Sequence, residues 1–356
     1  MVGEAGADFG HFGPGFIATL PVRSGEALAE SKEWICSTLG RITVTYGRSS
    51  ARRLCSMCFS RGVTFHVLTA VLAVLGCCKN LYPQNKKMLL AIGDVHRKIY
   101  QHDAVSHALA TIERLGYESG LFDTYIRTDI QLITKHPIHF PETRAVPDSS
   151  GKSVNYKTLK DFDAIFFYGI GELELTDQQK ADLISFIRDD GKGLVGVHTA
   201  IASFYTWPLW GQMIGGYFDD HPWLIFDAPI INEAPDFPAM KELPHTFVVR
   251  DEIYQVKDFE RDQVRVLARL DPTKIDLNNP RVHRSDHDFP VAWARTYGKG
   301  RVFYASFGHT KESWDDPRLE KMWLEAILWA MGLEPGDARP RTGRSGGNGV
   351  VTVTRR

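Results

Sequence analysis

Short apolar runs alternate with amphipathic segments through the middle of the chain. Ala164–Tyr168 is apolar without alternation, which is typical of a strand covered on both faces. An apolar stripe at helical spacing follows within Leu175–Gly193, and a second apolar run occupies Leu194–Val197. A strand, a helix and a second buried strand in this order form a βαβ unit, so the pattern predicts a parallel sheet.

The same alternation continues on both sides of this unit. Met88–Ile92 and Glu118–Asp123 are predicted strands, and Tyr100–Gly116 between them is a predicted helix that Gly116 ends. Four later runs have the composition of strands: Thr246–Arg250, Val264–Leu270, Val291–Thr296 and Val302–Phe307. The last two are joined by a predicted hairpin turn, Tyr297–Arg301. Together these elements predict an α/β fold, a doubly wound parallel sheet with an antiparallel β extension.

Helix-start signals support three of the predicted boundaries. Thr176 and Gln179 have the spacing of a capping box, and Asp316-Pro317 opens the last predicted helix. Asp103 lies at the start of the first helix, where a carboxylate can cap the backbone or complement the helix dipole. The segment between the second and third strands, Thr124–Asp161, is long and irregular, which fits either a functional lid or a disordered loop.

Four histidines lie where predicted elements begin or end: His102, His198, His221 and His309. The carboxyl ends of parallel strands form the ligand crevice of open α/β sheets, so these rings are expected to line one cleft. His198 directly follows a strand, on a tight turn that would lift its side chain into the crevice. A histidine in this position can also be structural, with its ring satisfied by a nearby carbonyl group.

An imidazole exchanges protons near neutral pH, binds divalent metals and donates hydrogen bonds to hydroxyl groups. We therefore expect His198 to act as a general acid or base with Glu252 as its partner at the rim of the cleft, although an exposed structural role fits Glu252 equally. All four histidines are also candidate ligands for Zn²⁺ or Mn²⁺. The chain has no HExxH or CxxC spacing, no GxSxG, no P-loop and no GxGxxG motif. Serine hydrolase, nucleotide hydrolase and dinucleotide cofactor chemistry therefore lack their motifs.

Composition excludes some classes of partner. A net charge of −1 gives no electrostatic footprint for nucleic acid, and 43% hydrophobic residues are enough for a sizeable core. The five cysteines all precede the predicted sheet, at Cys36, Cys55, Cys58, Cys77 and Cys78. They therefore imply no disulfide framework for that domain.

The first part of the chain has a different character. Arg61, the apolar run Val63–Leu75 and the small residue Gly76 before Cys77 have the order of a secretory signal peptide with a loose bacterial lipobox. A buried helix of an N-terminal extension is the alternative interpretation, and it would fit a cytoplasmic protein. The apolar run is too short to span a membrane comfortably.

The signal interpretation leads to a domain organisation. We expect an upstream extension without structure at residues 1–56, a signal segment at 57–78 with export from Met57, and a lipid anchor at Cys77. The protein would then be periplasmic or a membrane-anchored lipoprotein. One domain is expected at residues 87–332, and the Gly-, Pro- and Arg-rich segment 333–356 is expected to be a disordered tail.

Several ordered motifs resemble the ThuA-like (trehalose utilisation) family. They are G-L-V-G-V-H-T-A around His198, G-G-Y-F-D-D-H-P ending at Pro222, and the long stretch that ends in F-G-H-T at Thr310. The H-D pair at His102 and the D-E-I-Y motif, Asp251–Tyr254, are similar to family motifs as well.

The resemblance implies a flavodoxin-like fold of the class I glutamine amidotransferase type. In the amidotransferase relatives, a nucleophilic cysteine occupies the elbow where this chain has His198. No cysteine follows Cys78, so cysteine glutaminase chemistry is excluded.

The family association also implies a sugar as the small-molecule substrate. We expect an acid–base enzyme, a sugar hydrolase or isomerase acting on trehalose-like or keto sugars, with substrate contacts from His102, Asp103, His221, Tyr254 and His309. Two alternatives remain open, a sugar-binding module without catalytic activity and a metal-dependent hydrolase, because fold does not determine function.

Overall fold

The computed structural model describes residues 86–95, 100–138 and 156–341, which all belong to the compact unit Leu75–Arg356. The expected signal segment, its lipid anchor site and the upstream extension lie outside the described residues. In the described part of the chain, no helix is both long enough and apolar enough to cross a membrane.

Nine strands of the described residues form one mixed sheet in the order β2-β1-β3-β4-β11-β10-β9-β6-β7. The first five are parallel: β2 (Phe122–Arg127), β1 (Lys87–Gly93), β3 (Ala164–Tyr168), β4 (Gly193–Val197) and β11 (Gly300–Ala305). The last four are antiparallel to their neighbours: β10 (Pro290–Tyr297), β9 (Arg265–Leu270), β6 (Ile225–Asn232) and β7 (Thr246–Glu252). The parallel order is that of flavodoxin-like folds, which confirms the predicted fold class.

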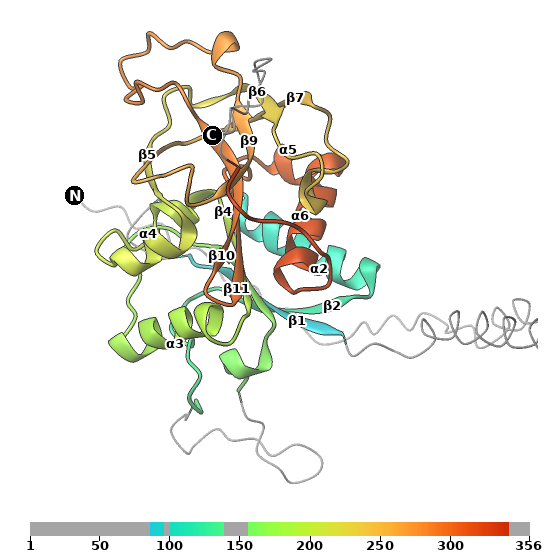
Figure 1. Ribbon diagram of the computed structural model, residues 1–356. Helices are drawn as coiled ribbons and strands as arrows, with labels where there is room; N and C mark the ends of the chain where they lie inside the picture. The colour runs from blue at the N-terminus through green and yellow to red at the C-terminus, as the bar shows by residue number, and fades with distance from the viewer. Residues whose placement is uncertain (1–85, 96–99, 139–155, 342–356) are drawn as a thin grey trace, which may run out of the picture. The chain divides into compact units, whose positions relative to one another are not determined.

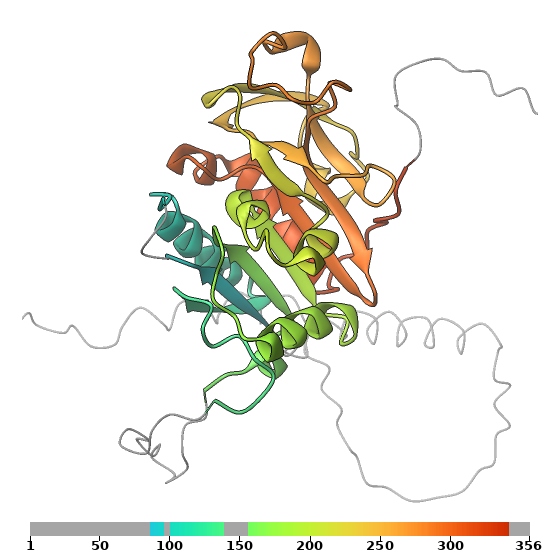
Figure 2. The same cartoon turned by 90° about the vertical axis from the view of Figure 1, so that its left-hand side faces the viewer.

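The antiparallel extension is continuous with the parallel sheet. Figure 2 shows the parallel strands of the first half and the yellow to orange antiparallel strands as parts of one twisted sheet. The hairpin between β10 and β11 makes the transition, because β11 pairs with β4 in parallel and with β10 in antiparallel register. A separate short sheet pairs β5 (Tyr217–Asp220) with β8 (Gln255–Lys257).

Helices cover both faces of the sheet (Figure 1). One apolar layer lies under α2 (Val105–Ser119), α5 (Lys311–Trp314) and α6 (Pro317–Ala330), and the other under α3 (Asp177–Arg188) and α4 (Pro208–Ile214). Side chains of a strand alternate between faces, so Leu89 enters the first layer and Leu90 the second. The described residues also form the 3₁₀ turns η2 (Leu159–Asp161), η3 (His198–Ala202), η4 (Pro238–Met240) and η5 (Pro272–Lys274).

The predicted helix starts at Thr176 and Asp316 are confirmed. The Thr176 hydroxyl accepts from the backbone N–H of Gln179, whose side chain returns a bond to the backbone of Thr176. Asp316 accepts from the N–H of Arg318 at the start of α6.

The predicted end of the first helix is wrong. α2 continues through Gly116 to Ser119 and ends at Gly120, whose φ of 68° is left-handed. Gly116 is needed for close packing instead, because a Cβ there would lie 2.6 Å from the ring of Phe122. The second strand consequently begins at Phe122, four residues later than predicted.

Asp103 does not cap α2, because Ala104 is the N-cap residue and no side chain bonds to the helix start. Of the expected tail, 333–356, only residues 333–341 are described, and this first part packs on the domain. Ala338 is buried, and the side chain of Arg265 donates to the carbonyl of Asp337.

A buried carboxylate joins the edge strand β7 to the loop that follows the central strand β11. Asp251 of β7 accepts hydrogen bonds from the backbone N–H groups of Gly308 at 2.7 Å and Thr310 at 3.1 Å, in the loop that follows β11. It also accepts from the N–H of Glu252 at 3.0 Å. Burial, the largest influence, raises the pKa of Asp251, although His198 and these backbone donors oppose it. The loop is thereby held against β7.

We predict that Asp251→Asn lowers the free energy of unfolding by about 1–3 kcal/mol. The amide nitrogen of Asn cannot accept a hydrogen bond, so at least one buried N–H group loses its partner. Urea denaturation measures the change, and Asp227→Asn on the exposed part of β6 is the matched control, expected to stay within about 0.5 kcal/mol. Equal effects of the two substitutions would contradict the assigned role of Asp251.

Candidate functional site

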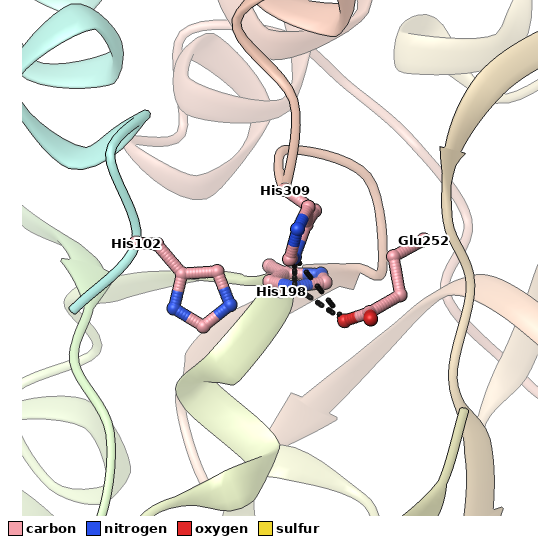
Figure 3. Close-up of side chains that lie close together, drawn as sticks. All are labelled: His102, His198, Glu252 and His309. Carbon is pink, nitrogen blue, oxygen red and sulfur yellow. Dashed lines mark hydrogen bonds and ion pairs between the residues drawn. The ribbon is translucent and has the colours of Figure 1, made fainter. Parts of the chain in front are cut away.

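Three imidazoles and one carboxylate converge from four separate segments of the chain (Figure 3). His198 follows β4, His309 follows β11, His102 precedes α2, and Glu252 ends β7. One ring nitrogen of each histidine and one carboxylate oxygen all lie within 4.8 Å of one another. The rule that parallel strands present their carboxyl ends to one crevice accounts for the three histidines.

His198 is held rigidly at the end of β4. Its φ of 43° is left-handed, an uncommon conformation for a residue other than glycine that carries strain of about 1–3 kcal/mol. The Tyr304 hydroxyl donates to its backbone carbonyl at 2.8 Å, and its Nδ1 donates to the carbonyl of Ser306 at 2.7 Å. Because a carbonyl can only accept, Nδ1 carries the proton and Nε2 offers a lone pair in the neutral ring. Tyr254 places its hydroxyl 2.7 Å from that Nε2.

Glu252 lies at the centre of the cluster, where its carboxylate faces two of the imidazoles. Its Oε2 is 3.2 Å from Nδ1 of His309 and 3.5 Å from Nε2 of His198. Burial alone would raise the pKa of Glu252, but hydrogen bonds and positive charge from His198 and His309 in their protonated forms outweigh it and hold the pKa below its usual range. For His309, burial alone would lower the pKa, whereas Glu252 raises it, and the net direction is upward.

His102 closes the cluster as a neutral ring. Burial, followed by the neighbouring His198 and His309, lowers the pKa of His102 to about 3. Its Nδ1 is buried without a hydrogen-bond partner among the described residues. A buried ring nitrogen without a protein partner is suited to bind an ion or a water molecule.

His221 is near the cluster but bonds outside it. Arg281 donates to Nδ1 of His221 at 3.1 Å and also pairs with the carboxylate of Asp220. A guanidinium has no acceptor, so Nδ1 of His221 is unprotonated when this bond forms and Nε2 carries the proton. The distance from Nδ1 to Oε1 of Glu252 is 3.8 Å. His221 is therefore placed to donate through Nε2, apart from the four converging groups.

A cavity of about 600 Å³ lies over the cluster. Four ionisable groups line it, His102, His221, Glu252 and His309, together with the rings of Tyr100, Phe218 and Tyr254 and the apolar residues Ile170, Ala202, Leu224 and Ile225. His198 does not line this cavity, since its side chain is completely buried behind the others.

The structure brings most of the expected site residues together, but Glu252 and Asp103 do not lie where they were expected. Glu252 lies in the buried part of the site and not at its rim, because the bonds of Asp251 draw the end of β7 inward. Asp103 is exposed and does not line the cavity, since its side chain precedes the first turn of α2 and points to solvent.

Sequence analysis missed several residues that support the site. Tyr100, which packs edge-on against His102 at 4.8 Å, carried no motif signal. Asp251 lies inside the D-E-I-Y motif, so its neighbour Glu252 could have directed attention to it. Ser306 orients His198 through its backbone carbonyl, and Arg281 contacts His221 from a loop distant in sequence. Neither contact has a local signal in the sequence.

Comparisons with solved structures found proteins similar to this chain. A ThuA-like protein from Bacteroides uniformis has a similar structure, with a TM-score of 0.52 and 22% identity over 70% of this chain and 95% of the other. A ThuA-like protein from Parabacteroides merdae matches with a TM-score of 0.49 and 16% identity, over 70% and 90% of the two chains. PurLQS from Thermotoga maritima matches with a TM-score of 0.41 and 13% identity, over 68% and 98%. The comparison with curated proteins found no match.

The family model for ThuA, described as trehalose utilisation, matches residues 95–330, which is more than half of the chain. The matched range contains all four converging groups. The match also confirms the family resemblance that the motifs indicated. The description implies a role related to carbohydrate utilisation. The chain belongs to the ThuA family.

Proposed function

We propose that the protein is a divalent-metal-dependent enzyme that acts on a sugar. The observation that carries the proposal is the convergence of three imidazoles and one carboxylate beneath a cavity of about 600 Å³. His102, His198, Glu252 and His309 would hold the ion.

The separations of the ligand atoms fit such an ion. Zn²⁺ binds nitrogen and oxygen ligands at about 2.0–2.2 Å, so two ligands of a tetrahedral site are roughly 3.4 Å apart. The three pairs formed by Nε2 of His198, Nδ1 of His309 and Oε2 of Glu252 are separated by 3.2, 3.3 and 3.5 Å. The nearby ring of His102 supplies a fourth donor atom.

The protonation states of two of the four groups fit such an ion. Metal ligands must be deprotonated, and Glu252 has a lowered pKa while His102 has a pKa of about 3. Glu252 raises the pKa of His309, so this ring would release a proton when the ion binds. Metal-binding histidines usually donate their other ring nitrogen to a carbonyl or carboxylate, and His198 does so to Ser306. Nε2 of His198 and Oε2 of Glu252 are 3.5 Å apart, so one cation could bind both atoms.

The expected role of His198 as a direct general base fits less well. A general base must come within hydrogen-bond reach of the proton that it removes, directly or through one water. His198 is completely buried and reaches the cavity only through Tyr254 and its neighbours. A position behind the cavity suits a metal ligand better than a group that touches the substrate.

The remaining cavity residues suit a sugar. When bound, a divalent ion supplies a Lewis acid that polarises a sugar carbonyl or hydroxyl oxygen. His221 offers an N–H group from Nε2 to a substrate hydroxyl, and Arg281 keeps that tautomer in place. Tyr100 and Phe218 provide aromatic surface for the apolar face of a sugar ring. A hydrolase and an isomerase both fit this arrangement.

A sugar-binding module without catalytic activity is the competing interpretation. Such a module would use aromatic platforms with few converging ionisable groups. Here His102, His221, Glu252 and His309 all line one cavity, and this concentration of titratable groups favours catalysis.

We predict that the chain, freed of metal by chelation, binds about one equivalent of Zn²⁺ or Mn²⁺ in isothermal titration calorimetry. His309→Ala and Glu252→Gln should each weaken binding by at least roughly tenfold to a hundredfold, the loss typical even of outer-shell partners. His107→Ala is the matched control, because this half-exposed ring pairs with Asp315 away from the cluster. Equal affinity in His309→Ala and His107→Ala would contradict the proposal.

We also predict that His221→Ala retains the metal but loses turnover. The substrate would come from a screen of disaccharides and their keto forms by thermal shift of the metal-loaded protein. Loss of a proton-donating group costs roughly a hundredfold or more in turnover. His283→Ala is the control, since its exposed ring pairs with Asp219 outside the cavity. Unchanged turnover in His221→Ala would show that this ring takes no part in the reaction.

A further inference from the structure

A second cavity, of about 650 Å³, lies on the α4 side of β10. Its walls come from α4, from the end of β10 and from the loop after β8. The residues that line it are Tyr205, Pro208, Gly211, Gln212, Gly215, Tyr217, Asp258, Glu260, Gln263, Arg295 and Tyr297. None of them lines the cavity over the histidine cluster.

Arg295 in this cavity is a cation without an anion. Its Nη1 donates to the carbonyl of Gln212 at 2.7 Å, and its guanidinium lies 5.9 Å from the ring centre of Tyr297. Its Nε is buried and has no hydrogen-bond partner within the described residues. No carboxylate of residues 86–95, 100–138 or 156–341 lies within 4.0 Å of it. Burial lowers the pKa of Arg295, and the nearby Tyr297 opposes this only in part.

Other arginines in the described part of the chain are better satisfied. Most of them pair with a carboxylate, as Arg261 does with Glu233 and Asp288. Arg127 and Arg301 have no acidic partner either, but each donates to two backbone carbonyls. Arg295 donates to one carbonyl only, and it lines a cavity. A half-buried guanidinium in this state is suited to bind an oxyanion.

The other polar groups in and beside the cavity indicate which functional groups such a ligand has besides its oxyanion. Lys257 lies over the ring of Tyr205 at 5.3 Å and adds a second positive charge beside the cavity. Asp258 and Glu260 are exposed and line the same cavity, where they can accept hydrogen bonds from hydroxyl groups. Gln212 and Gln263 offer amide groups to the same space. A simple anion would leave these acceptors unused and would be repelled by them.

We propose that this second cavity binds a small polyhydroxylated acid, with the oxyanion on Arg295 and the hydroxyl groups toward Asp258 and Glu260. The volume of the cavity is sufficient for a ligand of one or two sugar rings. The oxyanion is either the carboxylate of a sugar acid or the phosphate of a phosphorylated sugar. The proposal does not rest on the metal or on the chemistry proposed for the histidine cluster.

Isothermal titration calorimetry tests the proposal with three probes at equal ionic strength: D-glucuronate, D-glucose 6-phosphate and D-glucose. We expect one of the two acids to bind at least tenfold more tightly than glucose. The acid that binds identifies the oxyanion as a carboxylate or a phosphate. Weak and equal binding of all three probes would overturn the proposal.

Substitutions locate the binding. Arg295→Gln should weaken binding of the acid by roughly tenfold or more, because a charge-assisted hydrogen bond is lost. Arg339→Gln removes the same charge from an exposed side chain and should leave binding unchanged. Arg295→Lys retains the charge without the planar fork and gives an intermediate affinity, and it serves as the test if the glutamine variant is unstable. Unchanged affinity in the substituted Arg295 chain would overturn the proposal.

A last measurement separates this cavity from the metal site, because an acid could also bind an ion there. The titration is repeated with chelator present and with His309→Ala. Binding that survives both conditions and depends on Arg295 supports the second site, whether or not the cluster binds metal. Binding that disappears with the chelator would place the acid at the histidine cluster and overturn the proposal.

Discussion

The carboxylate of Asp251 is the point on which the arrangement of the site depends. It lies in β7 at the far antiparallel edge of the sheet, and it binds backbone N–H groups of Gly308 and Thr310 after the last parallel strand. These bonds fix His309 from one side and Glu252 from the other. Without them, two of the four converging groups would belong to independent loops. A fully buried charge is costly unless its hydrogen bonds are satisfied. If the loop after β11 moved away, Asp251 would lose these bonds, so the end of β7 and this loop keep their positions together.

The fold and the histidines of the site could be predicted because both follow local rules. Apolar runs and amphipathic helices predicted the parallel strands, and the strand-end rule then placed His198 and His309 at the same edge. The depth of His198 could not be predicted, because it depends on Tyr254 and Glu252, which reach it from the other half of the sheet. The sequence pattern predicts where a strand ends, but it does not predict which distant residues cover that end.

The elements that sequence analysis missed are those formed by distant pairings. β5 has the sequence Y-F-D-D, and its two acids would not suggest a strand. It is stable as one because Asp219 accepts from Gln255 of β8 and Asp220 pairs with Arg281. The helix end predicted at Gly116 was wrong for a related reason. Glycine is needed there for close contact with Phe122, not to end the helix.

β5 has a further consequence, because its successive side chains point to opposite faces. Tyr217 lines the second cavity, Phe218 lines the cavity above the histidines, and the hydroxyl of Tyr205 donates to the Phe218 carbonyl. One short strand is therefore a wall of both spaces, and a displacement of its backbone reshapes them simultaneously. Thermodynamic linkage makes any such coupling reciprocal: occupancy of either space changes the affinity of the other by the same factor.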